Sequence, residues 1–298
     1  MGLPEMKEKV FLILQLVLVL FSCIKTKAAD KVLEKNIERI VCLSPSGAEI
    51  LCELGAKNKI VARTDFCDYP SDLQEIYSVG GFDGKSISLE NIVQCKPDFV
   101  YCAKGMHEAI TQGLEKLGVE CYLAESSDLD SIKEEIIFIG KKLALTEQAD
   151  FLCRKIDLEI AKVSDKIKNE VPASEQNLSV YYEVWNSPLM TCGKKSYINS
   201  LLEICGLQNI FNALDEAYPI ISEESIIINN PQVILVPKEN GVTGVDFQKR
   251  NGWKEVRAVK NNRIYLLDSD IVSRPGPRII DAVKHIAGLV YTQIDFYE

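Results

Sequence analysis

The sequence predicts an α/β protein of two Rossmann-like lobes with mainly parallel sheets, joined by one long helix. Short apolar runs alternate with amphipathic segments along most of the chain, a pattern typical of parallel sheets covered by helices. Similar runs occur in both halves. Between the halves, residues 141–171 contain neither glycine nor proline. These observations predict an N-terminal lobe at 39–143, a linking helix at 144–171 and a C-terminal lobe at 172–298.

The elements of the first lobe can be assigned in order. Short runs rich in β-branched residues predict strands, and amphipathic segments predict helices. Gly55 and Gly118 fit the ends of two of these helices, and Pro97 breaks a third. The expected strands are 39–44, 59–64, 98–103 and 119–125, and the expected helices are 46–55, 88–95, 107–118 and 129–144.

The linking helix has a continuous apolar stripe. Thr146 is suited to be its N-cap. The stripe predicts a helix of about seven turns, roughly 36 Å long, that could run along both lobes. The apolar residues follow one another at intervals of three or four: Ala149, Leu152, Ile156, Ile160, Val163 and Ile167.

The second half restarts the alternation and repeats part of the first. Strands are expected at 178–184, 232–237 and 263–268, and helices at 196–206, 222–230 and 277–294. The stretch ISLENIVQCKPDFVYC, which begins at Ile87, aligns without a gap with ISEESIIINNPQVILV, which begins at Ile221. Each copy keeps a glutamate, Glu90 or Glu224, near the start of its helix. The sequence therefore predicts a duplicated lobe, with a cleft where strand ends of both copies face each other.

Composition narrows the function. The chain is 47% apolar and 26% charged, as in an ordinary globular protein, and long enough for two modest domains or one large one. The formal net charge of −9 argues against nucleic acid as a partner, because nucleic-acid binding requires a basic surface. We interpret the acidic excess as a solvated surface.

The N-terminus indicates export. Residues 10–21 are apolar except for Gln15, and as a helix they would span roughly 18 Å, too short to cross a bilayer. We expect a signal peptide at 1–22, with translation starting at Met1 or Met6. LFSC, ending at Cys23, resembles a bacterial lipobox, which predicts lipidation of Cys23 and a tether at 23–38. The alternative is plain cleavage near Ala28.

The ten cysteines show no CxxC motif and no tight framework. Several lie inside apolar runs, where cysteine behaves as a small hydrophobic residue. Lipidation of Cys23 would leave an odd number. We therefore expect mostly free, buried thiols.

Five strings, in this order, resemble the substrate-binding proteins of ABC importers for vitamin B12, ferric siderophores and haem. The strings are LSPSGAEI, DFCDYP, SLENIVQCKPDFV, TCGKKSYINSLLEICGLQNIF and SRPGPRI. The resemblance covers residue 39 to the C-terminus and is strongest to the cobalamin-binding (BtuF-like) branch. It implies a class III periplasmic binding protein fold: two lobes bridged by one helix. It also implies a monomer that captures a ligand outside the cytoplasm and delivers it to a permease dimer and its ATPase.

The resemblance gives the repeated glutamates a role. In this family an exposed glutamate on each lobe docks into an arginine pocket on the permease dimer, and Glu90 and Glu224 match by position. A partner with two-fold symmetry needs the same charged group on both lobes. Alternatively, the interaction of each glutamate with its helix dipole would be enough to explain its position.

The ligand is expected between the lobes, with cobalamin or another corrinoid favoured and haem or a ferric siderophore as the alternative. Asp270 and Arg274 could bond amide side chains of a corrin ring or simply pair with each other. The sequence departs from the cobalamin branch at Phe82, where tryptophan is common, and at Ala103, where a second aromatic is expected. The positions that match family contacts are Phe66, Phe82, Trp185, Tyr218, Asp270 and Arg274.

Two other classes of function fit less well. Metal importers need several histidines with a carboxylate, whereas this chain has only His107 and His285. His107 could ligate a metal centre near the cleft, but we interpret it as an ordinary solvated histidine, and His285 as structural. No G-x-S-x-G elbow, phosphate loop or cysteine with a nearby histidine occurs, so we do not expect an enzyme. A redox metalloenzyme is the remote alternative.

Overall fold

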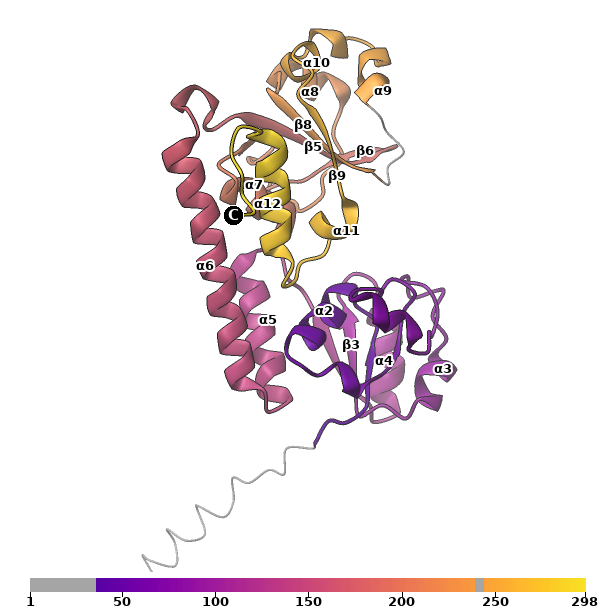
Figure 1. Cartoon of the computed structure of the whole chain (residues 1–298). Helices are drawn as coiled ribbons and strands as arrows, with labels where there is room; N and C mark the ends of the chain where they lie inside the picture. Colours follow the sequence, from indigo (N-terminus) through magenta and orange to yellow (C-terminus); the bar gives the residue numbers. More distant parts are fainter. Residues whose placement is uncertain (1–35, 239–243) are drawn as a thin grey trace, which may run out of the picture. The chain divides into compact units, whose positions relative to one another are not determined.

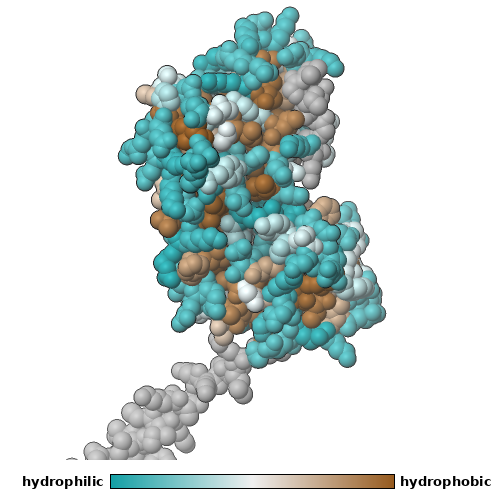
Figure 2. Space-filling view, in the orientation of Figure 1, coloured by the Kyte–Doolittle hydropathy of each residue, from teal (hydrophilic) through white to brown (hydrophobic). Residues whose placement is uncertain are grey.

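The computed structural model describes residues 36–238 and 244–298. The expected signal peptide, Cys23 and most of the tether lie outside these ranges. Within them, no helix is both long enough and apolar enough to cross a membrane. Figure 2 shows a face of the described chain that is covered mainly by hydrophilic residues, with apolar residues in separate small groups.

The N-terminal lobe contains four parallel strands in the order β2-β1-β3-β4. Alternate residues of a strand point to opposite faces, so Ile40 joins the apolar core under α2 and α5 while Val41 joins that under α3 and α4. The sheet is therefore covered on both sides (Figure 1). Its elements are β1 (Ile40–Cys42), α2 (Pro45–Glu53), β2 (Ile60–Arg63), α3 (Leu89–Gln94), β3 (Phe99–Ala103), α4 (Glu108–Lys116), β4 (Glu120–Ala124) and α5 (Leu129–Lys142), with short 3-10 turns at Lys57–Lys59 and Ser71–Glu75.

The C-terminal lobe repeats this arrangement. Parallel β7, β8 and β9 are arranged around β5 as β2, β3 and β4 are around β1. The antiparallel strand β6, which the sequence reading missed, extends β5 into a hairpin. The elements are β5 (Ser179–Asn186), β6 (Leu189–Thr191), α7 (Tyr197–Ile204), β7 (Gln208–Asn209), α8 (Glu223–Asn229), β8 (Val233–Pro237), α9 (Gly244–Lys249), α10 (Arg257–Lys260), β9 (Ile264–Leu267), α11 (Ser269–Val272) and α12 (Ile279–Val290), with 3-10 turns at Ala173–Glu175 and Trp253–Glu255.

The repeated stretch has the same structure in both lobes. When Ile87 is laid on Ile221, the first residues of α3 and α8 coincide, and so do the first residues of β3 and β8. Ser88 and Ser222 cap the two helices, each accepting a hydrogen bond from a backbone N–H three residues on, at 3.2 and 3.3 Å. The duplication predicted from the sequence is thus present in the fold.

The two lobes are joined by α6 (Thr146–Glu170), a helix of 25 residues. All six residues of its expected apolar stripe are buried. On the polar side, Lys133 of α5 pairs with Asp157 at 2.9 Å, and Lys284 of α12 pairs with Glu159 at 2.7 Å. The helix is therefore attached to an element of each lobe.

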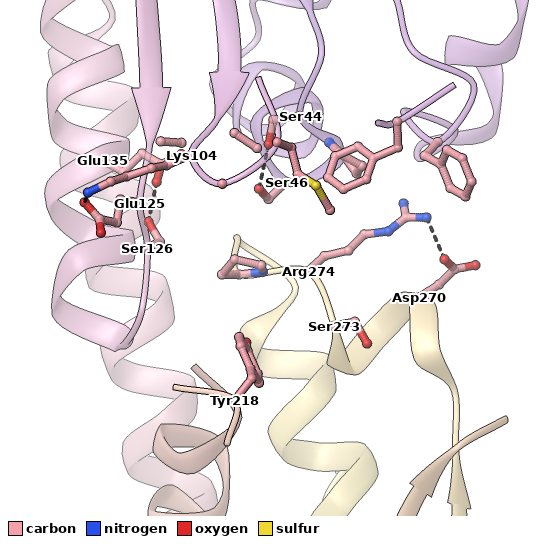
Figure 3. A pocket seen from close by; sticks show the side chains of 18 of the residues that line it. Ser44, Ser46, Lys104, Glu125, Ser126, Glu135, Tyr218, Asp270, Ser273 and Arg274 are labelled. Atoms are coloured by element: carbon pink, nitrogen blue, oxygen red, sulfur yellow. Dashed lines mark hydrogen bonds and ion pairs between the residues drawn. The ribbon is translucent and has the colours of Figure 1, made fainter. Parts of the chain in front are cut away.

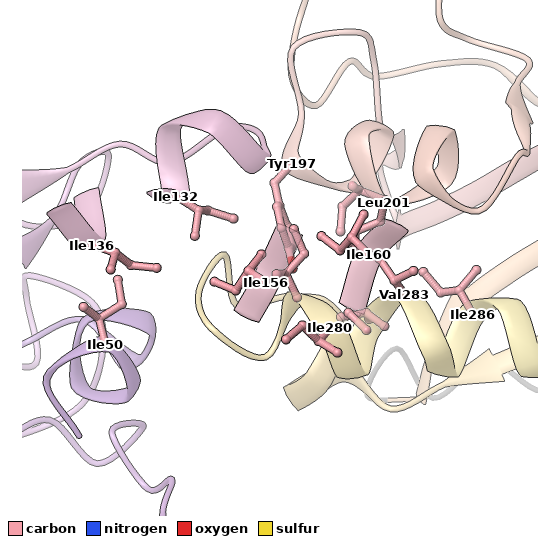
Figure 4. Close-up of a cluster of buried hydrophobic side chains, with 14 of the residues drawn as sticks. Ile50, Ile132, Ile136, Ile156, Ile160, Tyr197, Leu201, Ile280, Val283 and Ile286 are labelled. Atoms are coloured by element: carbon pink, nitrogen blue, oxygen red, sulfur yellow. The ribbon is translucent and has the colours of Figure 1, made fainter. Parts of the chain in front are cut away.

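The apolar contacts of α6 also reach both lobes. In Figure 4, Ile156 and Ile160 lie between isoleucines of α5 and residues of α12. One apolar cluster thus continues along α6 from one lobe to the other, while the two sheets remain separate. A continuous apolar seam of this kind resists large hinge bending of the helix.

Thr146 was wrongly expected as the N-cap of this helix. It is the first helical residue, and Leu145 occupies the cap position without a side-chain hydrogen bond. The chain turns tightly out of α5, with Ala144 at a φ of 57° and the Leu145 N–H bonded to the Gly140 carbonyl at 2.7 Å. This turn starts the helix one residue before the threonine could cap it.

Candidate ligand cleft

A cavity of about 760 Å³ lies where the carboxyl ends of the strands of both lobes meet. Ligands of α/β proteins bind at this edge of a parallel sheet. The N-terminal lobe contributes the segments that follow β1, β2, β3 and β4, and the C-terminal lobe contributes Tyr218 and the segment around α11 (Figure 3). A second cavity of about 960 Å³ shares Glu125, Ser126 and Tyr218 with the first.

Two phenylalanines form the aromatic part of the wall. The rings of Phe66 and Phe82 are 6.0 Å apart at an interplanar angle of 60°. Phe66 is 54% exposed and Phe82 is half-buried, so both present ring surface to the cavity. Ala103, where a second aromatic residue was expected, also lines the cavity and leaves more room there.

His107 stabilises the loop that carries Phe82. Its Nδ1 accepts a hydrogen bond from the Ala103 N–H at 2.9 Å, so its Nε2 carries the proton and donates to the Phe82 carbonyl at 2.8 Å. The ring is fully buried and packs edge-on against Phe82, with centroids 5.5 Å apart. Burial lowers the pKa of His107, and its hydrogen bond to Phe82 opposes this. The interpretation of His107 as a solvated histidine was therefore wrong, since loop packing buries it.

Arg274 links the two lobes at the cavity. Its guanidinium bonds to Asp270 at 2.6 Å within its own lobe, and to Asp68 at 2.8 Å and Glu49 at 3.4 Å on the other lobe. Arg274 is only 8% exposed. Of the two sequence alternatives for Asp270 and Arg274, mutual pairing is present, and contact with a ligand stays a prediction.

Arg278 adds a second link to the same carboxylate. Its Nε donates to Glu49 Oε2 at 3.0 Å and its Nη2 to Oε1 at 2.5 Å. Its guanidinium also lies 4.0 Å from the centre of the Tyr69 ring. Burial raises the pKa of the Glu49 carboxyl, opposed by the hydrogen bonds and charges of Arg278 and Arg274.

Glu135 is a buried acid that lines the cavity, whereas Glu49 does not line it. It is 3% exposed, and its two carboxylate oxygens accept hydrogen bonds from the hydroxyls of Tyr101 and Ser126. Burial raises the pKa of this carboxyl, while the bonds from Ser126 and Tyr101 lower it. The Tyr101 ring sits so close to Gly47 of α2 that a Cβ at Gly47 would lie 2.3 Å from it, which explains the glycine.

The structure brings five of the six predicted ligand contacts to one cavity: Phe66, Phe82, Tyr218, Asp270 and Arg274. Trp185 does not line this cavity. It is half exposed in the β5–β6 hairpin, and its indole N–H donates to the Ser187 carbonyl at 2.9 Å.

Glu49 and Glu135 were missed as functional candidates. Each lies beside isoleucine or leucine in an amphipathic helix and is buried, so an acid inside an apolar stripe was the available signal.

Glu90 and Glu224 lie in matching exposed places on α3 and α8. Two hydrogen bonds lower the pKa of each carboxyl. The larger effect comes from the glutamate's own backbone N–H and the smaller from the hydroxyl of the capping serine. Both side chains therefore carry a negative charge at the surface.

Among the described residues, no cluster of three or more histidine, cysteine, aspartate or glutamate side chains could hold a metal ion. All nine cysteines within the described ranges are free thiols, and each is buried or half-buried.

Comparison with known proteins agrees with this architecture. A model of the periplasmic binding protein family matches residues 40–271. An uncharacterised ABC transporter substrate-binding lipoprotein, YvrC of Bacillus subtilis, is 28% identical over 268 residues, 88% of this chain and 82% of that protein. The vitamin B12-binding protein of Vibrio cholerae is 28% identical over 256 residues, 84% of this chain and 87% of that protein.

Solved structures show the same fold. A possible iron-binding periplasmic solute-binding protein from Staphylococcus epidermidis superposes with a TM-score of 0.76 at 29% identity, over 86% of this chain and 100% of that one. Its similarity extends over both lobes and α6, as expected for a class III periplasmic binding protein. The chain therefore belongs to the periplasmic binding protein family and is a substrate-binding protein of the ABC-importer type.

Proposed function

We propose that this protein captures vitamin B12 or a related corrinoid between its lobes and delivers it to the permease of an ABC importer. The observation that carries this proposal is the cavity between the lobes, with Phe66 and Phe82 on its wall. Aromatic rings on a concave wall suit a large, flat and partly apolar ring system. The name of the Vibrio cholerae relative supports the choice of ligand class.

The size of the cleft also supports a large ligand. Drug-sized molecules occupy pockets of about 300–1,000 Å³. Here the first cavity alone has about 760 Å³, and it adjoins the larger second cavity through Ser126 and Tyr218. A corrinoid could therefore place its ring in the first cavity and extend toward the second.

In this proposal the protein works outside the cytoplasm, attached to the membrane by a lipid on Cys23. The lipobox-like LFSC and the lipoprotein name of the Bacillus subtilis relative support the anchor. Labelling of growing cells with a fatty-acid analogue should mark the protein, and Cys23→Ser should abolish the label. An unchanged label in that variant would exclude Cys23 as the lipid site.

The ligand can be tested directly by absorption and fluorescence titration. The purified protein is mixed with cyanocobalamin, haemin or a ferric siderophore, and the spectral shift and the quenching of Trp185 and Trp253 are followed. We expect saturable binding of cyanocobalamin. Saturable binding of haemin or the siderophore without cyanocobalamin binding would favour the alternative ligand class, to which the possible iron-binding protein from Staphylococcus epidermidis points.

A pair of matched variants tests the site. Phe66 and Tyr77 are each 54% exposed, but only Phe66 lines the cavity. Phe66→Ala should weaken cyanocobalamin binding roughly tenfold, because a ring contact contributes about 1 kcal/mol beyond its buried area. Tyr77→Ala should leave the affinity unchanged. Equal losses of affinity in the two variants would show that cyanocobalamin does not bind in this cavity.

A further inference from the structure

Glu135 stands out as a buried acid without a cation. The side chain comes from α5 and reaches the cavity wall beside Ser126, as Figure 3 shows. Within the described part of the chain, its partners are the Tyr101 and Ser126 hydroxyls, and no basic side chain forms an ion pair with it. Each carboxylate oxygen can accept two hydrogen bonds, so both oxygens keep a free acceptor position.

Packing alone does not account for an acid at this position. The neighbouring residues of the same helix face, Ile132, Ile136 and Ile139, are fully buried apolar side chains. Burying a carboxyl there is unfavourable relative to another apolar residue unless hydrogen bonds compensate, and an ionised carboxylate without a cation is the most costly form. A role at the cavity would explain why the position is acidic.

The basic side chains of the cavity are already paired, whereas its acids Glu108 and Glu135 form no ion pair within the described residues. Lys104 forms an ion pair with Glu125. Arg274 is engaged by Asp270 and by acids of the other lobe. Among the described lining residues, these two are the basic side chains. A ligand carboxylate entering the cavity would therefore have to displace an existing pair, and it would meet the uncompensated acid Glu135.

We propose that Glu135 is a specificity-determining residue that accepts hydrogen bonds from amide N–H groups of the ligand and rejects ligand carboxylates. This inference rests on the proposed function and deepens it. A cobalamin ring bears primary amide side chains, which are hydrogen-bond donors, whereas haem bears two carboxylates. The cavity then selects a donor-bearing corrinoid over an anionic tetrapyrrole by its charge as well as by its shape.

The test compares ligands that differ in one group. Mild acid hydrolysis converts single amides of cyanocobalamin into carboxylates, and the monocarboxylate isomers can be separated. For the unaltered protein, we expect at least one isomer to bind roughly tenfold or more weakly than cyanocobalamin. Glu135→Gln keeps the shape and adds a donor, so the discrimination against that isomer should fall to about threefold or less.

Glu134→Gln is the matched control. Glu134 is the preceding residue of α5 and is exposed, so the variant removes the same charge from the same helix without touching the cavity wall. It should discriminate as the unaltered protein does. Equal discrimination by Glu135→Gln, or equal binding of cyanocobalamin and every monocarboxylate by the unaltered protein, would overturn the assignment while leaving corrinoid capture intact. The second comparison needs no variant to fold. An absence of all corrinoid binding would overturn both proposals.

Discussion

Arg278 and Glu49 form a two-point ion pair between the lobes, with Nε–Oε2 and Nη2–Oε1 distances of 3.0 and 2.5 Å. Arg278 occupies the N-cap position of α12 in the C-terminal lobe, and Glu49 lies in α2 of the N-terminal lobe. Arg274 approaches the same carboxylate at 3.4 Å. Together with the rigid α6, this buried contact fixes the separation of the lobes on one side of the cleft.

Removing the carboxylate should be strongly destabilising. Glu49→Ala leaves two largely buried guanidinium groups without their shared partner, and we expect a loss of about 3–5 kcal/mol in the free energy of unfolding. Denaturant titration measures it. Asp72→Ala, which breaks the surface pair with Lys57, serves as the control and should cost less than about 1 kcal/mol. Similar losses in the two variants would show that the inter-lobe pair adds nothing beyond a surface pair.

The stability of the protein should depend on pH through Glu135. Because burial raises the pKa of this carboxyl, its contribution to stability is fully present below the ordinary glutamate pKa of about 4.3. The contribution is lost as the pH rises through the raised folded-state pKa. Glu135→Gln does not titrate, so its unfolding free energy relative to the unaltered protein should increase from pH 4 to pH 8. A constant difference between the two across that range would contradict the raised pKa.

His107 should control ligand affinity through Phe82. His107→Ala leaves the Ala103 N–H and the Phe82 carbonyl without their buried partner, which we expect to cost about 2 kcal/mol or more of stability. The loosened Phe82 loop should also weaken corrinoid binding. His285→Ala removes the acceptor of the Asp268 N–H but no cavity-lining contact, so it should lower stability without lowering affinity. Fluorescence titration of both variants separates the two effects, and unchanged affinity in His107→Ala would refute the link.

The two surface glutamates should be needed for uptake and not for capture. The double variant Glu90→Lys and Glu224→Lys places repulsive charges opposite the arginine pockets that the family resemblance implies on the permease. We expect uptake of labelled corrinoid by cells to fall at least roughly tenfold, because like charges that face each other suppress a complex. The affinity of the purified protein for the ligand should not change.

The control for this experiment reverses two exposed glutamates elsewhere, Glu134 and Glu147. It makes the same change in net charge away from α3 and α8, so uptake should stay normal. If the control and the double variant reduce uptake equally, the effect comes from net charge, and the docking role of Glu90 and Glu224 is wrong.

Local patterns in the sequence were enough to predict most of the fold. The stripe on α6 predicted a long helix because six apolar residues at helical spacing can bury one face, and all six are buried. The repeat predicted equivalent elements because α3–β3 and α8–β8 each fit within a short, uninterrupted stretch. The expected N-cap of α6 was wrong, and the short elements β6, β7, α9, α10 and α11 were not predicted, since all of these depend on neighbouring segments.

The sequence by itself therefore determined the two lobes, the linking helix and the loops that carry most of the cavity wall, because each depends on short-range periodicity. Only the tertiary structure decided which side chains meet. Glu49 and Arg278 are 229 positions apart, and no local pattern pairs them. Burial of His107 and Glu135 likewise follows from packing between segments distant in sequence. This burial changes the pKa of each side chain. It also allows His107 to position the Phe82 loop and Glu135 to select a ligand.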